Sequence, residues 1–381
     1  MPTTTLSLAK YLAHDTRYLL LSPYLCTMQT PANEKRTEIG ALGEFGLIRL
    51  LTNSIKLNQE SSIKGVGDDA AVVNHQGKNT VITTDMLAEG IHFDLMYTPL
   101  KHLGYKAIVV NLSDIYAMNA TPTQVTVSIA ISNRFSVEAI EEIYEGIYVA
   151  CKKYGVDLVG GDTTSSLSGL VISVTALGVA NSEDLVYRNG AKPGDAICVS
   201  GDLGSAYLGL QILEREKQIY LEHPDVQPDL ENEQYIIGRQ LKPEARKDVI
   251  ELLKEHGIKP TSMIDISDGL SSEILHICTQ SGVGAKLYED QVPISEEAYN
   301  LAIKFNLDPI TCALNGGEDY ELLFTVKAED VTKLSNEWNV TVIGRIAEKS
   351  EGVTLTTKGG NVFPISAQGW DPLIKAGILD A

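Results

Sequence analysis

Aspartates recur along this chain inside short stretches of glycine, serine and threonine, and no lysine-bearing phosphate loop accompanies them. Carboxylates beside small residues suit hard divalent cations, which keep most of their waters and bridge to phosphates. If the fold brings these stretches together, they form a site for several magnesium ions and a nucleotide. The stretches are 65–69, 83–85, 111–114, 160–164, 265–269 and 316–319.

Two of the aspartates follow short runs that are typical of strands. Residues 80–84 predict a strand with Asp85 at its end, and 156–159 predict a strand that runs into a glycine-rich turn at Asp162. An aspartate in such a place often only caps a turn. The alternative is metal binding, with the glycines letting a phosphate approach the backbone closely. The repetition of the pattern favours metal binding.

Asp114 lies on a helix. Residues 103–118 carry apolar side chains at helical spacing, and Asn111 and Asp114, three positions apart, share a face of this helix. A carboxylate on an apolar face is costly unless it is paired or metal-bound. Metal binding is favoured here, and a salt bridge to Lys106 or Arg134 is the alternative.

Two further pairs of aspartates carry the same ambiguity. The segment 65–70 matches the spacing of a dinucleotide-binding fingerprint, but its middle positions are Asp68 and Asp69, which repel a pyrophosphate unless a metal ion intervenes. Metal ligation is therefore favoured over nicotinamide or flavin binding. Asp265 and Asp268 flank a strand-to-helix turn, where N-capping of the helix by Asp268 is the alternative to metal binding.

The composition of the whole chain limits the class of protein. Its 381 residues, 44% of them hydrophobic, fit one large or two ordinary globular domains. A formal net charge of -19 argues against nucleic-acid partners, and it means that a phosphate-bearing ligand needs bound cations in order to approach. No apolar run of about eighteen residues predicts a membrane span. Five scattered cysteines without a C-x-x-C pair are typical of a reduced, cytoplasmic protein.

Strands and helices alternate in both halves of the chain, which predicts an α/β or α+β protein. The turn-forming stretch 189–195 marks a domain boundary. We expect an N-terminal appendage over 1–34, a first domain over 35–188 and a second domain over 189–381. The predicted helices cover 43–51, 103–118, 137–153 (with Ser136 as N-cap and Gly155 as stop) and the residues from Leu270 onward; a charged segment over 211–235 is expected to be solvated helix and loop. The predicted strands cover 80–84, 156–159, 170–179, 196–200, 263–266, 320–326 and 340–343.

The sequence contains no residue set for covalent catalysis. Ser/His/Asp and Cys/His arrangements, the protein-kinase signatures and the G-x-x-x-x-G-K-[ST] loop are absent. His92 stands without a second histidine placed to form a zinc pair, and a lone histidine is usually structural. Arg188 precedes the domain boundary and is the best nearby cation for a triphosphate, with a surface ion pair as its alternative.

In this order, the motifs resemble the thiamine-monophosphate kinase family of the aminoimidazole ribonucleotide synthetase-like superfamily. The resemblance runs from about Glu38 to Trp370, and it rests on Gly-Gly-Asp-Thr-Thr at 160–164, Asp-Ile-Ser-Asp-Gly-Leu at 265–270 and Gly-Gly-Glu-Asp-Tyr-Glu-Leu at 316–322. Together these three are highly specific, whereas any one alone is not. The resemblance implies a two-domain fold of that superfamily, with an N-terminal domain whose mixed sheet forms a homodimer interface and a C-terminal α/β domain.

The resemblance also implies roles for individual residues. Magnesium ions are expected at Asp69, Thr83, Thr84, Asp85, Asp114, Asp162, Asp265 and Asp268. Contacts to ATP are expected from Gly161, Asp162, Arg188 and Ser267. Contacts to thiamine monophosphate are expected from His92, Glu318 and Trp370, although the match near Trp370 is loose because Pro372 stands where the family has a histidine.

The implied activity is transfer of the γ-phosphoryl group of ATP to thiamine monophosphate, which gives thiamine diphosphate. The acceptor is an ionised phosphate oxygen, so no catalytic base or nucleophile is expected and transfer is direct. The main requirement is positioning, together with neutralisation of the charge between two phosphorylated substrates. One alternative is an ATP-dependent cyclo-ligase of the same superfamily, against which His92 and 317–322 argue. The other is a non-catalytic ion-binding module.

Overall fold

The structure, a computed structural model, describes residues 50–64, 72–73, 75, 77–228, 230, 233–334, 337 and 339–366. The chain divides into two compact units. The first unit holds the described residues up to Leu185 together with Gly209–Lys247, and the second holds Val186–Leu208 and the described residues from Asp248 onward. The appendage expected over 1–34 lies outside the described residues.

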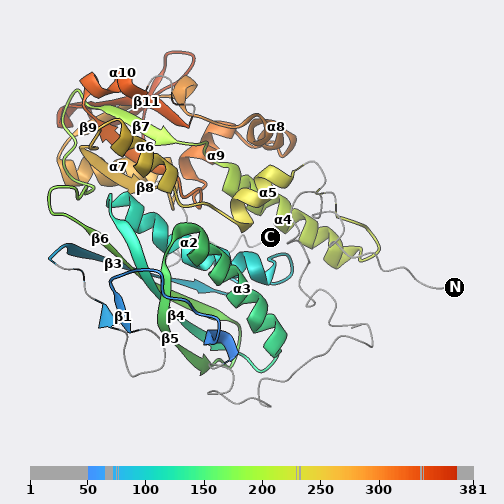
Figure 1. Ribbon diagram of the computed structural model, residues 1–381. Helices are drawn as coiled ribbons and strands as arrows, with labels where there is room; N and C mark the ends of the chain where they lie inside the picture. The colour runs from blue at the N-terminus through green and yellow to red at the C-terminus, as the bar shows by residue number, and fades with distance from the viewer. Residues whose placement is uncertain are drawn as a thin grey trace. The chain divides into compact units, whose positions relative to one another are not determined.

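The first unit is built on a four-stranded sheet with the order β3-β6-β4-β5 (Figure 1). Strands β4 and β5 run parallel and the other neighbours are antiparallel, so the sheet is mixed. Two long helices, α2 and α3, pack against each other, and α2 also contacts β3 and β6. The elements are β1 Ser62–Lys64, β2 Val72–Val73, β3 Asn79–Ala88, α2 Leu100–Ala117, β4 Thr121–Ile131, α3 Val137–Tyr154, β5 Asp157–Ser165, β6 Val171–Ala180, α4 Ser205–Glu222 (from Gly209 onward) and α5 Gln234–Leu241.

One face of this sheet is covered and the other is open. Side chains such as Val127 and Val174 are 1% exposed on the covered face. The alternate residues of β3 point the other way, and Ile82 and Met86 are 65% and 58% exposed. We call this second surface the open face; it presents the row Met86, Ser173, Ser128 and Asp162, which are paired across the four strands.

Two sequence predictions about the sheet were wrong. Strand β3 does not end before Asp85 but continues to Ala88, and β5 runs through the predicted glycine-rich turn to Ser165. Pairing with β4 along almost its whole length keeps β5 extended. Gly161 packs closely against the backbone of β4. A Cβ added to it would lie 1.8 Å from the Val127 carbonyl oxygen. Its role is therefore close approach of two strands, not a turn.

The helix predicted from Ser136 is confirmed. The Ser136 hydroxyl oxygen accepts a hydrogen bond from the Ala139 N–H at 3.3 Å, and Gly155 ends α3 in the left-handed conformation with φ 71°. A polar N-cap and a glycine at the C-terminus are the signals from which both limits of the helix were predicted.

The segment Gly209–Lys247 is held on the helices of the first unit by a polar cluster. Glu244 accepts hydrogen bonds from the hydroxyls of Tyr105 and Tyr154, each at 2.6 Å, and forms an ion pair with Lys153. The helical part of this segment is not solvated on all sides, because Ile212 and Leu213 are buried in it. The expectation of a solvated segment is confirmed only for the exposed loop 223–227.

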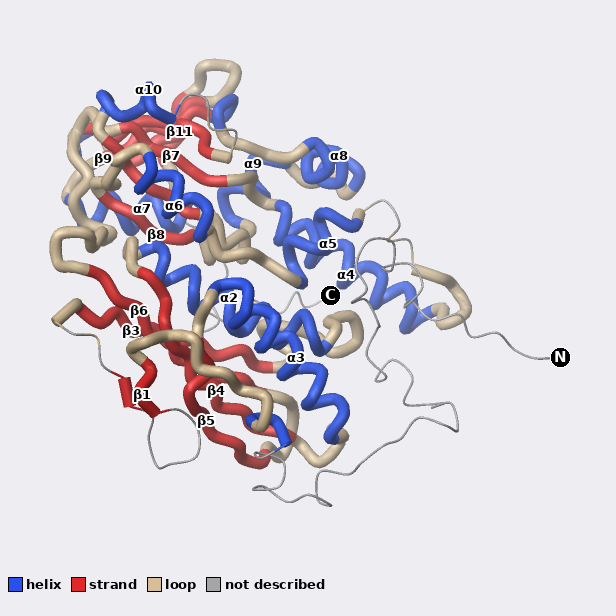
Figure 2. Tube along the Cα trace, in the orientation of Figure 1, coloured by secondary structure: helices blue, strands red, loops and turns tan. Residues whose placement is uncertain are grey.

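The second unit is built on a seven-stranded sheet with the order β13-β12-β9-β11-β7-β10-β8. Its strands β7, β8, β9 and β11 are labelled in Figure 2. A buried core of aliphatic side chains from its strands and from α7 fills one side of this sheet. The elements are β7 Ala196–Ser200, the first turn of α4 as far as Leu208, α6 Lys247–Glu255 (from Asp248 onward), β8 Ser262–Asp265, α7 Leu270–Ser281, β9 Gly284–Tyr288, α8 Glu296–Lys304, α9 Pro309–Asn315, β10 Leu322–Val326, α10 Val331–Leu334, β11 Val340–Ala347, β12 Val353–Thr356 and β13 Val362–Pro364, with single 3-10 turns at Glu289–Gln291, Ala328–Asp330 and Lys349–Glu351.

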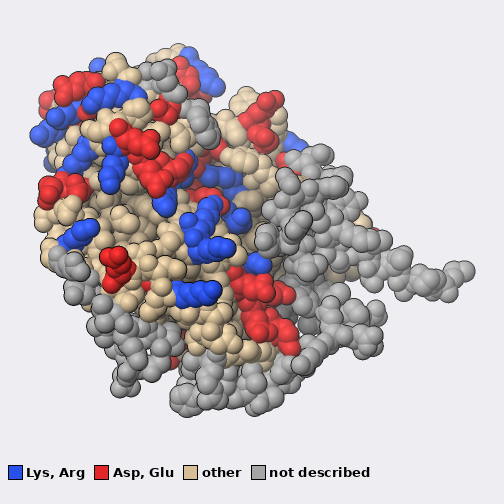
Figure 3. Space-filling model, in the orientation of Figure 1, with Lys and Arg blue, Asp and Glu red and all other residues tan. Residues whose placement is uncertain are grey.

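Three general properties of the described residues bear on function. Acidic and basic side chains are interspersed on the face drawn in Figure 3, and no continuous basic surface is seen there. Within the described part of the chain, no helix is long and apolar enough to cross a membrane. In the same part, Cys151, Cys198, Cys278 and Cys312 are buried free thiols.

Candidate functional site

In the first unit, β3 and α2 bring three of the predicted metal ligands together. The Thr83 hydroxyl donates a hydrogen bond to Oδ2 of Asp114 at 2.6 Å. One helical turn earlier, Oδ1 of Asn111 accepts the backbone N–H of Asp85 at 2.9 Å, and its Nδ2 group donates to the Ala107 carbonyl. Asn111 and Asp114 therefore share a helix face, as predicted, and that face is turned toward β3. We call Thr83, Asp85 and Asp114 the acidic pair site.

The two carboxylates of the acidic pair site oppose each other electrostatically. Burial, together with the negative charge of Asp114, raises the pKa of Asp85 to about 6. Both effects disfavour the ionised form. A bound cation would reverse this balance, because it is the opposite charge that both carboxylates need. The oxygen donors present, two carboxylates and a hydroxyl, are those that magnesium prefers.

The strand phase places two other predicted ligands on the opposite side of the sheet. Thr84 follows Thr83 and lies on the open face, where Thr175 donates a hydrogen bond to its hydroxyl oxygen at 3.1 Å. Asp162 is exposed on the same face but lies on the other edge strand, β5. Three strand spacings, about 14 Å, separate these edges. The acidic pair site and Asp162 are therefore not brought together by one copy of the sheet.

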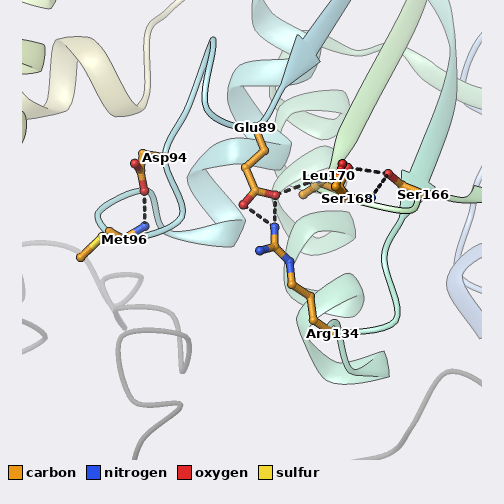
Figure 4. Close-up of polar contacts among 7 residues, drawn as sticks. All are labelled: Glu89, Asp94, Met96, Arg134, Ser166, Ser168 and Leu170. Atoms are coloured by element: carbon orange, nitrogen blue, oxygen red, sulfur yellow. Dashed lines mark hydrogen bonds and ion pairs between the residues drawn. The ribbon is translucent and has the colours of Figure 1, made fainter.

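His92 lies in a tight connection that follows β3. The Ala88 N–H donates to Nδ1 of His92 at 3.1 Å, and the His92 N–H donates to the Ala88 carbonyl at 2.9 Å. Just before it, the Glu89 carboxylate accepts hydrogen bonds from the Arg134 guanidinium and from the Leu170 N–H (Figure 4). Two other segments, those of Arg134 and Leu170, thus contact Glu89 and fix the start of this connection.

The far side of the same connection is tied to α4. The Asp94 carboxylate accepts the Met96 N–H at 2.7 Å (Figure 4) and forms an ion pair with Lys217 at 2.7 Å. The Tyr97 hydroxyl donates to Glu214 at 2.7 Å. The charged α4 segment, whose purpose the sequence does not disclose, therefore holds residues near His92 in place.

In the second unit, the two remaining motifs form one corner. The Glu318 N–H donates to the Ser267 carbonyl at 2.7 Å, and the Tyr320 N–H donates to the Ile266 carbonyl at 2.9 Å. Both Glu318 and Tyr320 have positive φ angles, 59° and 52°. Such a conformation costs free energy in residues other than glycine and collects at functional sites. We call residues 265–269 with 316–321 the motif corner.

Gly317 allows the motif corner to close. Its φ is 75°, and a Cβ added to it would lie 2.6 Å from the Ser267 carbonyl oxygen. A side chain at this position would therefore be strained by the backbone and would also collide with the neighbouring motif. Close contact with Ser267, in addition to the positive φ angle, therefore requires glycine at this position.

The predicted metal and ATP ligands of the second unit lie at this corner or beside it. Asp265 ends β8 and is 5% exposed. Burial raises the pKa of Asp268, whose charged neighbours include His276, Glu318 and Arg188. N-capping by Asp268 is not observed, because Gly269 is the N-cap of α7 and makes no side-chain cap bond. The alternative explanation of Asp268 is thereby removed.

Three acidic residues at this corner have structural roles that the sequence did not predict. Asp319 accepts the N–H groups of Gly204 and Ala206, and Glu321 accepts the Ser200 hydroxyl at 2.5 Å. Glu273, in the first turn of α7, accepts hydrogen bonds from the Ser267–Asp268 turn. Asp319 and Glu321 are part of a recognised motif, but nothing in the sequence of Glu273 distinguishes it from an ordinary helix-start glutamate.

The described residues do not contain a cluster of three or more His, Cys, Asp or Glu side chains placed to hold one metal ion. Asp69 and Trp370 lie outside the described residues. The remaining predicted positions are therefore found in three places. The first is the acidic pair site, with His92 nearby in sequence, and the second is the open face with Thr84 and Asp162, next to Gly161 in β5. The third is the motif corner with Asp265, Ser267, Asp268 and Glu318, where Arg188 is a charged neighbour of Asp268.

Comparison with known proteins gives a class for this arrangement. Residues 67–180 match the AIR synthase related protein, N-terminal domain, and residues 192–356 match the AIR synthase related protein, C-terminal domain. The chain belongs to this class of two-domain proteins. Its mixed α/β architecture, with a four-stranded and a seven-stranded sheet, is the fold on which the candidate residues are displayed.

Within the class, the similarity is to one family. The chain is 36% identical over 333 residues to thiamine-monophosphate kinase of Aquifex aeolicus, covering 86% of this chain and 97% of that protein. It is 34% identical over 316 residues to thiamine-monophosphate kinase of Bacillus subtilis, covering 81% and 93%. A solved structure described as AaThiL complexed with AMPPCP and TMP matches with a TM-score of 0.67 and 34% identity over 89% of this chain and 99% of that chain. This chain belongs to the thiamine-monophosphate kinase family.

Proposed function

We propose that this protein transfers the γ-phosphoryl group of ATP to thiamine monophosphate, which gives thiamine diphosphate and ADP. The observation that carries the proposal is the match, over most of both chains, to relatives of that name, together with an acidic pair site that needs a counter-charge. In the reaction, a phosphate oxygen of thiamine monophosphate forms the new bond to the γ-phosphorus. The bond between that phosphorus and the β,γ-bridging oxygen breaks, and the electron pair leaves with ADP.

The oxygen donors at the acidic pair site fit magnesium. Thr83, Asp85 and Asp114 would hold an ion in the first unit, and Asp265 and Asp268 would hold one in the second, with Asp69, Thr84 and Asp162 as the further positions of the proposed set. When bound, magnesium neutralises phosphate charge and so lets two anionic substrates approach each other. Asn111 fixes the backbone at Asp85 through a 2.9 Å hydrogen bond, so that this carboxylate keeps its direction.

The substrate contacts divide between the two units. We assign contacts to ATP to Gly161, Asp162, Arg188 and Ser267, and contacts to thiamine monophosphate to His92, Glu318 and Trp370. The strained backbone at Glu318 is consistent with a side chain held in one direction for a ligand. Because the acceptor oxygen is already ionised, no side chain has to remove a proton, and no phosphorylated side chain is formed.

We also propose that the protein is a homodimer joined through the open face. Ile82 and Met86 expose apolar surface there, and Leu177 is only partly buried. Exposed apolar surface of this kind is typical of an interface. A partner at this face would also enclose Asp162, which a single sheet leaves exposed. The buried free thiols are consistent with a reducing, cytoplasmic location.

The activity is tested by incubating the purified full-length protein with ATP, magnesium chloride and thiamine monophosphate, and by separating the products chromatographically. Thiamine diphosphate and ADP are expected in equal amounts. Binding of ATP without any thiamine diphosphate would contradict the proposal. A parallel incubation with the formylglycinamidine ribonucleotide in place of thiamine monophosphate tests the cyclo-ligase, which would form aminoimidazole ribonucleotide and ADP there.

The dimer is tested separately by light scattering of the Met86→Asp variant. A charge placed in the middle of a buried apolar face should shift the mass from two chains to one. Lys152→Asp, on the exposed side of α3, is the matched control and should leave the mass unchanged. A wild-type protein with the mass of one chain would refute the dimer without bearing on the activity.

A further inference from the structure

Glu273 makes an unusual set of contacts at the start of α7. It is 1% exposed, and a single oxygen of its carboxylate, Oε1, accepts three hydrogen bonds. The donors are the Ser267 N–H at 3.1 Å, the Asp268 N–H at 2.9 Å and the Ser267 hydroxyl at 3.3 Å. All three belong to the turn that precedes the helix.

These contacts differ from ordinary helix capping. In a capping box, the acidic side chain is the third helical residue and accepts the N–H of the N-cap. The N-cap here is Gly269 and the third helical residue is Ser272, so Glu273 is one position later. Its carboxylate reaches back beyond the N-cap to Ser267 and Asp268. It therefore holds the turn and not the helix end.

The same turn is held from its other side by the second motif. The Ser267 carbonyl accepts the Glu318 N–H at 2.7 Å, so Ser267 is fixed at its N–H, its hydroxyl and its carbonyl. A continuous line of contacts runs from Glu273 through Ser267 to Glu318. Movement of the turn would change the spacing between Ser267 and Glu318.

Stability alone is a poor explanation for Glu273. Its other oxygen, Oε2, is buried and has no hydrogen-bond partner among the described residues. A buried carboxylate with one unpaired oxygen costs free energy, and an uncharged side chain would avoid that cost. Costs of this kind are tolerated where a side chain fixes a functional group in one geometry.

We propose that Glu273 is a positioning residue that holds the Ser267–Asp268 turn in the conformation that binds the nucleotide. The inference rests on the proposed function, in which Ser267 contacts ATP and Glu318 contacts thiamine monophosphate. Glu273 touches neither substrate. It acts through the three hydrogen bonds that its Oε1 accepts, so an acceptor oxygen at the same distance is what the position requires.

The test is calorimetric titration of the full-length protein with a non-hydrolysable ATP analogue in excess magnesium. Glu273→Gln keeps one acceptor oxygen and should bind within about threefold of wild type. Glu273→Asp withdraws the carboxylate by one methylene and Glu273→Ala removes it, and both should bind about 10- to 100-fold more weakly, as is typical for loss of a supporting contact. Their KM for ATP should rise by a similar factor.

Asp195→Ala is the matched control. Asp195 is a carboxylate of the same unit, 7% exposed, that likewise holds a turn by accepting the Lys192 N–H at 3.0 Å and the Thr261 hydroxyl at 2.7 Å. Its substitution should lower the melting temperature and leave the affinity for the analogue unchanged. A purely structural Glu273 would behave in the same way.

Wild-type affinity in folded Glu273→Ala or Glu273→Asp would overturn the proposal, and so would a Glu273→Gln variant that binds as weakly as Glu273→Ala. If Glu273→Ala does not fold, the comparison of the Asp and Gln variants decides. The proposed function fails in a different way: the wild-type protein would form no thiamine diphosphate, whereas the titration would still rank the three variants by nucleotide affinity.

Discussion

The acidic pair site and the motif corner use the same kind of residue in opposite ways. At the acidic pair site, burial and the charge of Asp114 disfavour the ionised form of Asp85 and raise its pKa to about 6. At the motif corner, Asp319 and Glu321 accept hydrogen bonds from N–H and O–H groups of the fold. Ionisation of Asp85 is thus opposed by a neighbouring charge, whereas Asp319 and Glu321 are held by donors of the fold.

The difference shows that burial and motif membership do not by themselves identify a ligand. Asp319 and Glu321 are each 1% exposed and belong to a recognised motif, but the hydrogen bonds that they accept hold other parts of the chain. Asp85 and Asp114 are only partly buried, and their charges work against each other. A carboxylate available for a cation is thus the one whose protein environment opposes its charge.

The largest effect should come from the acidic pair site. Asp85→Asn removes one carboxylate of the proposed magnesium site, and we expect kcat to fall about 100- to 1,000-fold, as for loss of one charge-stabilising group. The melting temperature should stay the same or rise, because a like-charge contact is removed. The measurements are turnover of thiamine monophosphate and thermal unfolding without magnesium.

Asp225→Asn serves as the control for that variant, since Asp225 is an exposed aspartate of the same unit. It removes one negative charge from the chain without touching the site. Near-normal turnover in Asp85→Asn, or an equal loss in both variants, would be incompatible with a ligand role for Asp85.

The motif corner should respond in the reverse sense. Glu321→Ala leaves the Ser200 hydroxyl without its acceptor in a buried position, and we expect the free energy of unfolding to fall by about 2–4 kcal/mol. Turnover per folded molecule should stay within about twofold of wild type. Urea unfolding of Glu321→Ala, Ser200→Ala and the double variant measures the coupling between the two side chains.

That comparison would be broken if Glu321→Ala kept full stability but lost turnover. Glu321 would then belong with the acidic pair site as a residue used for function. Additive losses in the double variant would also count against the hydrogen bond as the source of the effect.

A smaller effect concerns a second place in the first unit where like charges meet. Burial, together with the positive charges of Lys242 and Lys101, lowers the pKa of His102 to about 4. The unfolded chain takes up a proton near pH 6.5 and the folded chain does not, so this contribution is complete above pH 6.5 and is lost as the pH falls toward 4. The loss should amount to roughly 1–3 kcal/mol.

The measurement is urea unfolding of wild type and His102→Gln at pH 7.5 and pH 5. The glutamine variant should lose less stability between the two pH values than wild type does. Equal losses would show that His102 is solvated enough to titrate normally in the folded protein.

Much of the fold could be predicted from the sequence, because local signals define its elements. The N-cap Ser136 and the C-terminal Gly155 predicted the limits of α3. The short apolar run at 196–200 predicted β7 with the limits that are observed. Strand β5 was shortened in prediction because glycines disfavour strands, whereas pairing with β4 overrides that preference. No local sequence pattern predicts that Gly209–Lys247, which follows residues of the second unit, belongs to the first unit.

The site could be predicted in composition but not in arrangement. The order of the motifs indicates which residues belong to the site. The role of each one as a ligand stays a prediction. Thr83 and Thr84 point to opposite faces of the sheet because side chains alternate along a strand. A shift of one residue in the register would exchange their faces, and the sequence does not define the register. The role of Glu273 depends on where α7 begins, which fixes whether its side chain reaches the helix end or the turn before it.

The bonds between Ser267 and Glu318 have a consequence for how the chain folds. Strand β10, which follows Glu318 closely, pairs with both β7 and β8, so residues distant in sequence must meet before the corner exists. Contacts of such separation form late and slowly, because a long loop must be closed first. A chain still emerging from the ribosome therefore lacks this corner until β10 has been made. Nucleotide binding at this corner therefore requires that synthesis has passed β10 and that β10 has paired with β7 and β8.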